Sequence, residues 1–251
     1  LWESRQSPSP KNFQEVSHAA FADKETLQTR YDLGLVSLRD RALAEEIFYH
    51  IARRVQAIAQ NLPYVPDELE DLEKLLADKL VCNFSVFQSL PDAWAIHQLF
   101  PVVPLSRLLE PPTRRATLVD ISCDSDGKMD RFIDLHDVRQ TLPVHPVRPG
   151  EPYYLGVFLV GAYQDVLGSN HNLFGQVGEA HVRVEEEGFA IERFVGGETA
   201  ERVIEKMGFT ARELMLGVER LVRRSRLSPA EKGAFLERYA RELQGYTYLE
   251  D

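Results

Sequence analysis

Apolar residues are spaced helically near the start of the chain. Five of them recur at steps of four, four, four and three residues: Leu43, Ile47, Ile51, Val55 and Ile58. This spacing places the set on one face of a helix over 39–60. The spacing returns after Pro66 at Leu69, Leu72, Leu76 and Leu80. We therefore predict a second helix that begins at Pro66 and continues to Leu80.

Farther along, apolar runs become short and turn residues separate them. These runs predict strands at Val81–Val86, Ala116–Ile121, Arg131–Ile133, Tyr154–Val160, His181–Glu186 and Phe189–Arg193. Tyr154–Val160 is almost continuously apolar, which is typical of a strand buried on both faces. Glu187-Gly188 separates the last two runs and predicts a hairpin.

Helical spacing comes back toward the end, with two capping-box patterns, Thr210-x-x-Glu213 and Ser228-x-x-Glu231. The order of helices, antiparallel strands and helices predicts an α+β fold. We expect a helical segment over 1–80, a sandwich-like or barrel-like β domain over 81–195 and a C-terminal helical region over 196–251.

Composition narrows the class of protein. The chain has 251 residues, with 29 basic and 39 acidic residues and a net charge of −10, which argues against a nucleic-acid partner. No apolar run reaches the roughly 18 residues of a membrane span, so no membrane partner is expected. Two cysteines favour a reducing compartment, and we expect the cytoplasm. The chain begins at Leu1 without a Met, and we expect residues to be missing upstream.

The sharpest chemical signal is Ser122-Cys123-Asp124-Ser125-Asp126-Gly127, at the end of a predicted strand. Nearby carboxylates disfavour a thiolate, so Cys123 is expected to donate a proton rather than to attack as a nucleophile. Asp124 and Asp126 could bind a cationic group of a substrate. The alternative is a small buried cysteine beside a solvated turn. No metal site is predicted, because neither the histidines nor the aspartates have a metal-ligand spacing.

A second signal comes where Tyr154–Val160 ends. Gly161 and Ala162 are small enough for a ligand to approach the backbone, and Tyr163 follows at the start of a predicted short helix. Helix starts favour anions, so Tyr163 is a candidate for contacting a phosphate. The alternative is a tight corner into which Tyr163 packs. A third cluster, His171–Gly175, has no assigned role.

Five strings along the chain carry a resemblance: Asn83–Trp94, Cys123–Gly127, Pro152–Tyr163, His171–Gly175 and Gly245–Asp251. In this order they resemble the bacterial biosynthetic arginine decarboxylases, pyridoxal-phosphate enzymes of the alanine-racemase-like, fold type III class. The resemblance covers nearly the whole chain and is weakest over 1–22. Each string is modest alone, and the ordered set with the C-terminal tail is what makes the resemblance specific.

The resemblance implies much about the whole enzyme. Family members have a TIM-type barrel, then a helical insertion, a β domain and a C-terminal helical region. This chain resembles the last two fifths, so its expected partner is an N-terminal barrel outside the chain. The resemblance implies pyridoxal phosphate as the cofactor and L-arginine as the small-molecule substrate. The implied products are agmatine and CO₂, in polyamine and spermidine biosynthesis. A homodimer or a dimer of dimers is also implied.

Residue roles follow from the same resemblance. Cys123 is expected to reach the partner subunit's active site and to protonate the carbanionic intermediate after CO₂ leaves. Asp124, and more weakly Asp126, would face the guanidinium group, and Tyr163 would contact the cofactor phosphate. The Schiff-base lysine is expected in the barrel, so the chain alone is predicted to be inactive. Mg²⁺ is a further expectation from the family, although no cage of oxygen ligands is legible.

Two alternatives stay open. One is a non-catalytic module for oligomerisation or regulation. The other is a related decarboxylase that acts on lysine, ornithine or diaminopimelate. His97 stands where family members carry an acid, which leaves substrate choice open. In the relatives a strand from before the barrel joins this β domain, so we expect an open sheet edge that favours association.

Overall fold

The computed structural model describes residues 8–59, 61, 70–135, 137–161 and 163–250. It confirms the α+β class, with helices and small antiparallel sheets and no closed barrel among the described residues. The chain divides into two compact units, each assembled from three stretches of sequence. Unit 1 is Leu1–Asp78, Leu109–Thr117 and Gln140–Glu151, and unit 2 is Lys79–Leu108, Leu118–Arg139 and Pro152–Asp251.

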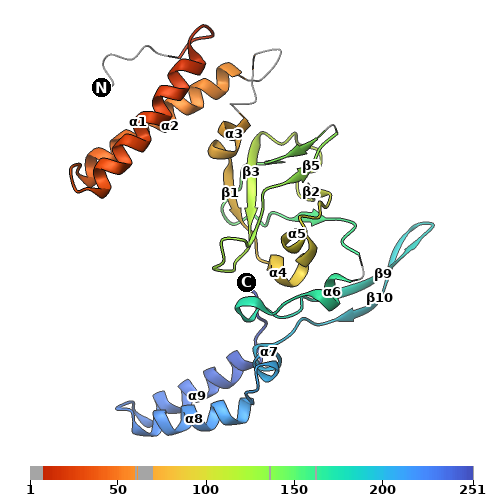
Figure 1. Cartoon of the computed structure of the whole chain (residues 1–251). Helices are drawn as coiled ribbons and strands as arrows, with labels where there is room; N and C mark the ends of the chain where they lie inside the picture. The colour runs from red at the N-terminus through yellow and green to blue at the C-terminus, as the bar shows by residue number, and fades with distance from the viewer. Residues whose placement is uncertain (1–7, 60, 62–69, 136, 162, 251) are drawn as a thin grey trace. The chain divides into compact units, whose positions relative to one another are not determined.

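Unit 1 contains the helices α1 (Phe13–Asp32), α2 (Leu38–Ala59) and α3 (Glu70–Leu76), and α1 and α2 lie side by side (Figure 1). The helix predicted over 39–60 is confirmed as α2. Its buried residues are Phe48, Ala52, Val55 and Ala59. This face is turned by one residue from the predicted one, and Leu43 is 55% exposed. The predicted helix start at Pro66 lies outside the described residues.

Strand β3 (Arg114–Val119) runs from unit 1 into unit 2. Its first half pairs with β7 (Leu142–Val144) in unit 1, and its last two residues pair with β4 (Lys128–Met129) in unit 2. Other short strands are β1 (Asp78–Val81), β2 (Val102–Pro104), β5 (Phe132–Ile133), β6 (Val138–Arg139) and β8 (Leu155–Val157). Every pair with a described register is antiparallel, as predicted.

Two predicted boundaries at the start of unit 2 are wrong. The second helix does not reach Leu80, which lies in β1. The strand predicted over Val81–Val86 ends at its first residue, and the helix α4 (Val86–Ser89) begins at its last. The reason is local, because the Ser85 hydroxyl accepts a hydrogen bond from the Gln88 amide and caps the helix.

The predicted strand over Tyr154–Val160 is also only partly correct. β8 covers three of its residues and pairs with β2 alone. Phe158 is 45% exposed and Leu159 is 84% exposed, so the expectation of burial on both faces is wrong. Leu159 has a φ of +59°, in the left-handed region, and such a residue cannot continue a strand.

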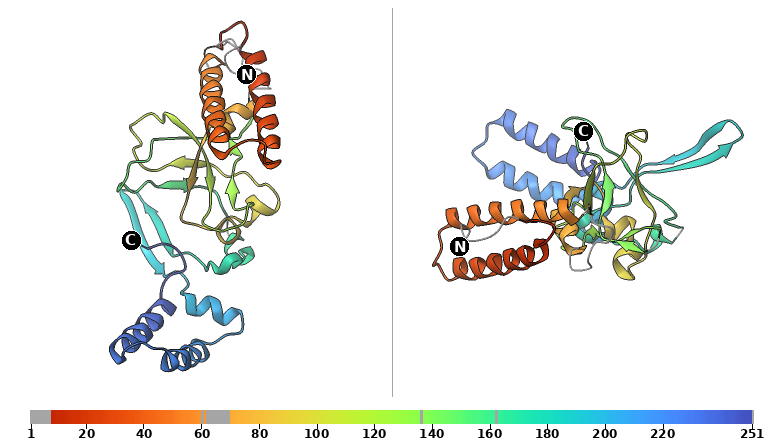
Figure 2. Two further views of the ribbon diagram at one scale, coloured as in Figure 1. Left: turned by 90° about the vertical axis from the view of Figure 1, so that its left-hand side faces the viewer. Right: turned by 90° about the horizontal axis from the view of Figure 1, so that it is seen from above.

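The predicted hairpin is confirmed as β9 (Glu179–Glu185) and β10 (Gly188–Val195). Both views of Figure 2 show the two strands running together as a ribbon. Gly188 lies at the turn with a φ of +102°, a conformation that favours glycine. The ribbon contains no site residue predicted from the sequence.

The end of unit 2 is helical, with α7 (Ala200–Lys206), α8 (Ala211–Arg224) and α9 (Pro229–Leu243). Both predicted capping boxes are present at the starts of α8 and α9. Three shorter elements support the candidate site: α5 (Pro91–Ala95), α6 (Gln164–Leu167) and a 3₁₀ turn at His171–Leu173. Among the described residues, no helix has the length and apolar character of a membrane span.

Candidate active site

The loop that carries Cys123 is tied down by a buried carboxylate. Asp120 follows β3 directly and is 5% exposed. Its Oδ2 accepts a hydrogen bond from the Val86 amide at 2.9 Å. Its Oδ1 accepts from the Ser122 amide at 2.8 Å and from the Ser122 hydroxyl at 2.5 Å. Asp120 therefore joins the first turn of α4 to the residue just before Cys123.

Sequence reasoning did not single out Asp120, although a signal was available. Aspartate often accepts a hydrogen bond from the backbone amide two residues later, which starts a turn. Asp120 stands between a predicted strand and a turn rich in serine, aspartate and glycine, and its partner two residues on is Ser122. The long-range bond to Val86 has no signal in the sequence.

Gly127 closes the same loop. The Asp120 amide donates to the Gly127 carbonyl at 2.8 Å. A Cβ atom at position 127 would collide with the Asp120 carboxylate and would lie 2.5 Å from the Ser122 hydroxyl oxygen. Glycine is needed here because the backbone approaches the buried carboxylate too closely for any side chain.

The structure brings the Cys123 loop against the 3₁₀ turn, 49 residues away in sequence. The Asn172 amide Nδ2 donates to Cys123 Sγ at 3.4 Å. His171 Nε2 lies 3.4 Å from Asp124 Oδ2, within ion-pair distance, although the two atoms do not satisfy hydrogen-bond geometry. Cys123 is exposed, in contrast to the buried cysteine of the alternative interpretation.

The 3₁₀ turn is itself held by α4. The rings of His171 and Phe87 have centroids 4.4 Å apart, and Trp94 packs edge-on against Phe87 at 5.2 Å. The Ser169 amide donates to the Phe87 carbonyl at 2.9 Å. Since Asp120 binds the first residue of α4, the Cys123 loop and the 3₁₀ turn share one support.

Asp126 lies on the other side of the same turn. Its backbone amide donates to Asp124 Oδ1 at 2.9 Å, which holds the Asp124 carboxylate against the turn. Asp126 also lines a cavity of about 330 Å³. The polar side chains of this cavity include His97, Lys128, Asp130 and Arg131. His97 therefore borders the same cavity as one of the predicted substrate-binding carboxylates.

Tyr163 precedes α6, as predicted, and is 76% exposed. Its hydroxyl has no hydrogen-bond partner within the described part of the chain. The next residue, Gln164, is buried, and its Nε2 donates to Asp92 Oδ2 in α5 at 2.6 Å. Tyr163 is thus presented to solvent by an anchored helix rather than packed into a corner. No hydrogen bond or ion pair among the described residues joins it to Cys123.

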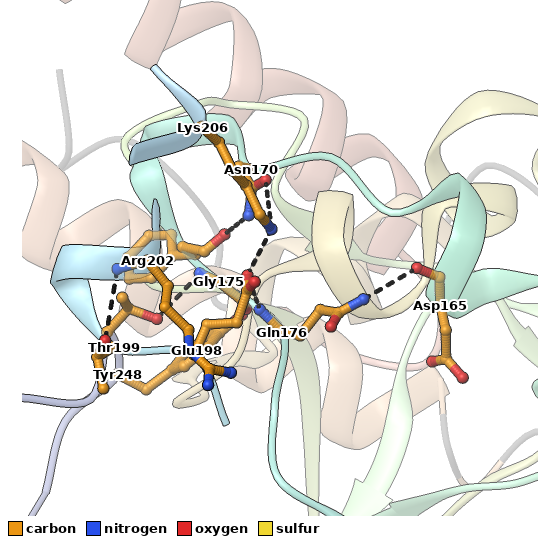
Figure 3. A network of polar contacts seen from close by, with 11 residues as sticks. Asp165, Asn170, Gly175, Gln176, Glu198, Thr199, Arg202, Lys206 and Tyr248 are labelled. Carbon is orange, nitrogen blue, oxygen red and sulfur yellow. Dashed lines mark hydrogen bonds and ion pairs between the residues drawn. The ribbon is translucent and has the colours of Figure 1, made fainter. Parts of the chain in front are cut away.

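A polar network holds the far end of the 169–176 segment (Figure 3). Lys206 Nζ lies 2.7 Å from Glu198 Oε2 and also donates to Asn170 Oδ1 at 3.4 Å. The Gln176 amide donates to the same Glu198 oxygen at 3.1 Å. Burial alone would raise the pKa of Glu198, but the bonds from Lys206 and the Gln176 amide lower it below its ordinary value.

The C-terminal tail completes this support. The Tyr248 hydroxyl donates to the Gly175 carbonyl at 2.9 Å, and its ring stacks on Phe174. Burial raises the pKa of Tyr248, so its hydroxyl stays protonated and able to donate. Leu249 exchanges two hydrogen bonds with the side chain of Asn83, at 2.8 and 3.0 Å. Strings that lie far apart in the sequence therefore converge on one support around the 3₁₀ turn.

The lysines bear on cofactor chemistry. All seven fall within the described residues: Lys11, Lys24, Lys74, Lys79, Lys128, Lys206 and Lys232. None of them is buried. A lysine that forms an imine is normally desolvated, and these residues do not offer that setting. Nor do the described residues contain a group of three His, Cys, Asp or Glu side chains suited to a metal.

Comparison with known proteins identifies the family. Residues 1–73 match the model of the arginine decarboxylase helical bundle domain, and residues 200–249 match that of the arginine decarboxylase C-terminal helical extension. The chain is 54% identical to the biosynthetic arginine decarboxylase of Deinococcus radiodurans and 45% identical to that of a Nostoc species. These matches cover 100% and 99% of the chain, but only 38% and 37% of the relatives.

A solved structure supports the same family assignment. The biosynthetic arginine decarboxylase SpeA from Campylobacter jejuni superposes with a TM-score of 0.79 at 32% identity. The match covers 98% of this chain and 39% of SpeA. The chain therefore belongs to the biosynthetic arginine decarboxylase family and corresponds to a C-terminal portion of its members.

Proposed function

We propose that this chain is the part of a pyridoxal-phosphate-dependent arginine decarboxylase that brings a proton donor and substrate-binding carboxylates to a barrel outside the chain. The observation that carries the proposal is the exposed Cys123 next to the half-buried Asp124, in a loop that the buried Asp120 anchors through Ser122. Relatives named as biosynthetic arginine decarboxylases support the reaction and its substrate.

Each residue then has a defined task. Cys123 Sγ holds the proton that passes to the substrate α carbon after CO₂ has left. Asp124 accepts hydrogen bonds from the guanidinium group, since a carboxylate and a guanidinium form strong charge-assisted pairs. Asp126 is a weaker candidate for the same contact. The exposed Tyr163 hydroxyl donates to a phosphate oxygen of the cofactor.

When bound, pyridoxal phosphate supplies the electron sink for the decarboxylation. Tyr163 fits such a group, because its hydroxyl is exposed and lies on an anchored helix. None of the lysines is buried as the Schiff-base role would require, so we propose that this lysine belongs to the barrel and that the chain alone is inactive.

The rest of the proposal rests on the family alone. We propose a cytoplasmic homodimer or dimer of dimers that makes agmatine for polyamine synthesis, with Mg²⁺ as a further requirement of the whole enzyme. The division into a helical segment over 1–80, a β domain over 81–195 and a C-terminal region over 196–251 is also a proposal. The two family models support its first and last parts.

The test uses the complete protein that contains this chain. CO₂ release is measured from arginine, lysine, ornithine and diaminopimelate, with pyridoxal phosphate added. We expect arginine to be preferred and Cys123→Ala to lower kcat by about a hundred-fold or more, as for loss of a general acid. Cys82→Ser, the matched control, should leave kcat within a few-fold.

Preference for another amino acid would overturn the substrate assignment. Full activity of C123A would overturn the role of Cys123. Borohydride treatment of the isolated chain with pyridoxal phosphate should fix the cofactor only sparsely and at no preferred lysine, read by peptide mass spectrometry, and stoichiometric fixation at a single lysine would refute the placement of the lysine in the barrel.

A further inference from the structure

We propose that Asn172 is a positioning residue for Cys123, aiming the thiol and stabilising the thiolate that remains after proton donation. The inference rests on the proposed function, because it takes Cys123 as the proton donor. The sequence places Asn172 in the His171–Gly175 string, which the residue roles above leave without a task.

The donor and acceptor atoms define the effect. Asn172 Nδ2 donates to Cys123 Sγ at 3.4 Å, so the sulfur is the acceptor in this contact. The S–H proton must then point away from Asn172. Because Cys123 is exposed, that proton is available to a substrate atom supplied from outside this chain.

The same contact strengthens as the proton leaves. The electron pair of the broken bond to CO₂ takes up the proton from Sγ, and a thiolate is left behind. A hydrogen bond to an ionised acceptor is stronger than one to a neutral acceptor. Asp124 is adjacent and disfavours this negative charge, so the amide of Asn172 offsets an opposing field. Solvent can later return a proton to the exposed sulfur.

The backbone explains why an asparagine occupies this position. Asn172 has a φ of +54°, in the left-handed region that asparagine tolerates better than most residues. The segment is fixed on either side, because Ser169 binds the Phe87 carbonyl and the Asn170 side chain donates to the Phe174 carbonyl at 2.9 Å. The amide is therefore aimed at the sulfur by a conformation that few other side chains adopt at low cost.

Two titratable side chains, Asp124 and His171, lie near this sulfur. Asp124 is its sequence neighbour, and His171 Nε2 lies beside the Asp124 carboxylate. The hydrogen bond described to the sulfur comes from Asn172 and not from either of these side chains. Replacement of Asn172 should therefore change the stability of the Cys123 thiolate while the pair of His171 and Asp124 stays in place.

The test measures how fast iodoacetamide alkylates Cys123 in the whole chain, read by peptide mass spectrometry over a range of pH. Asn172→Gly removes the amide and keeps the left-handed backbone accessible. Asn172→Asp keeps the shape and removes the donor. Asn61→Asp is the matched control, since it makes the same chemical change on an exposed asparagine of unit 1 whose side chain donates to the Ala57 carbonyl and not to Cys123.

We expect Asn172→Gly to be alkylated about five-fold more slowly at about pH 8, as for the loss of one hydrogen bond, and Asn172→Asp to be slower still. All rates should converge at high pH, where every thiol is ionised. A merely structural role would loosen the loop and speed alkylation at every pH. An unchanged or faster rate in Asn172→Gly, or equal slowing in Asn61→Asp, would overturn the proposal.

Activity separates this inference from the function on which it rests. In the complete enzyme, Asn172→Asp should lower kcat with little change in KM for arginine. If the Asn172 variants are alkylated more slowly but the parent enzyme does not decarboxylate arginine, the positioning role stands and the proposed function fails. Normal alkylation in an active enzyme would remove the positioning role alone.

Discussion

The buried carboxylate of Asp120 provides the sharpest test of how the Cys123 loop is held. Replacement of Asp120 by Ala removes three hydrogen bonds, from the Val86 amide, the Ser122 amide and the Ser122 hydroxyl. Val86 is fully buried, so water cannot replace the lost acceptor at its amide. The loop and the first turn of α4 would lose their common anchor.

The magnitude follows from the environment of each group. A hydrogen bond to a charged group contributes about 1.5–3 kcal/mol, and an orphaned buried amide costs about 1–3 kcal/mol. Allowing for relaxation of the exposed part of the loop, we expect Asp120→Ala to lower the free energy of unfolding by about 3–5 kcal/mol. Asp120→Asn keeps one acceptor oxygen and should cost less, about 1–2 kcal/mol. Ser122→Ala loses only the hydroxyl bond and should cost about 1 kcal/mol.

Urea unfolding measures this series. Trp94 packs on Phe87 in α4, so its fluorescence reports on this support once Trp2 has been replaced by Phe. Glu237→Ala, an exposed change on α9, is the control and should leave the midpoint in place. If Asp120→Ala unfolds within about 0.5 kcal/mol of the parent, or if Ser122→Ala costs as much, the anchoring argument fails.

Two further predictions concern titrating groups. Burial raises the pKa of the Cys82 thiol to about 11. Iodoacetamide near neutral pH should therefore label the exposed Cys123 and largely spare Cys82. Equal labelling of both cysteines, read by peptide mass spectrometry, would contradict this prediction. The lowered pKa of Glu198 means that its pairing with Lys206 stabilises the fold above the ordinary value of 4.5 and is lost as the pH falls below it. Lys206→Met should therefore cost about 1 kcal/mol in urea unfolding at neutral pH and progressively less below pH 4.5, and a gap that does not change with pH would refute this reasoning.

Local patterns in the sequence predicted the elements whose causes are local. The spacing of apolar residues found α2, the Glu187-Gly188 turn found the hairpin, and the Thr210 and Ser228 patterns found the starts of α8 and α9. Each depends on residues within a few positions of one another. Predictions failed where a nearby cap or a backbone constraint intervened, as when Ser85 turned a predicted strand into the start of α4.

The candidate site also has a part that the sequence predicted and a part that it did not. The sequence marked Cys123, Asp124, Asp126 and Tyr163 as residues with chemistry, because their types and neighbours are visible in a single string. Their roles in a reaction stay predictions. The sequence left the His171–Gly175 string without a role, since nothing local links it to a cysteine 49 residues away.

The sequence by itself determined the family resemblance, the class of the fold and the residues able to donate protons or bind cations. Only the tertiary structure decided which of them meet: Asn172 with Cys123, His171 with Asp124, and Asp120 with the start of α4. The physical reason is range. Capping and periodicity act within one or two turns of chain, whereas a contact such as that between Asp120 and Val86 exists only after both strings have packed against a common support.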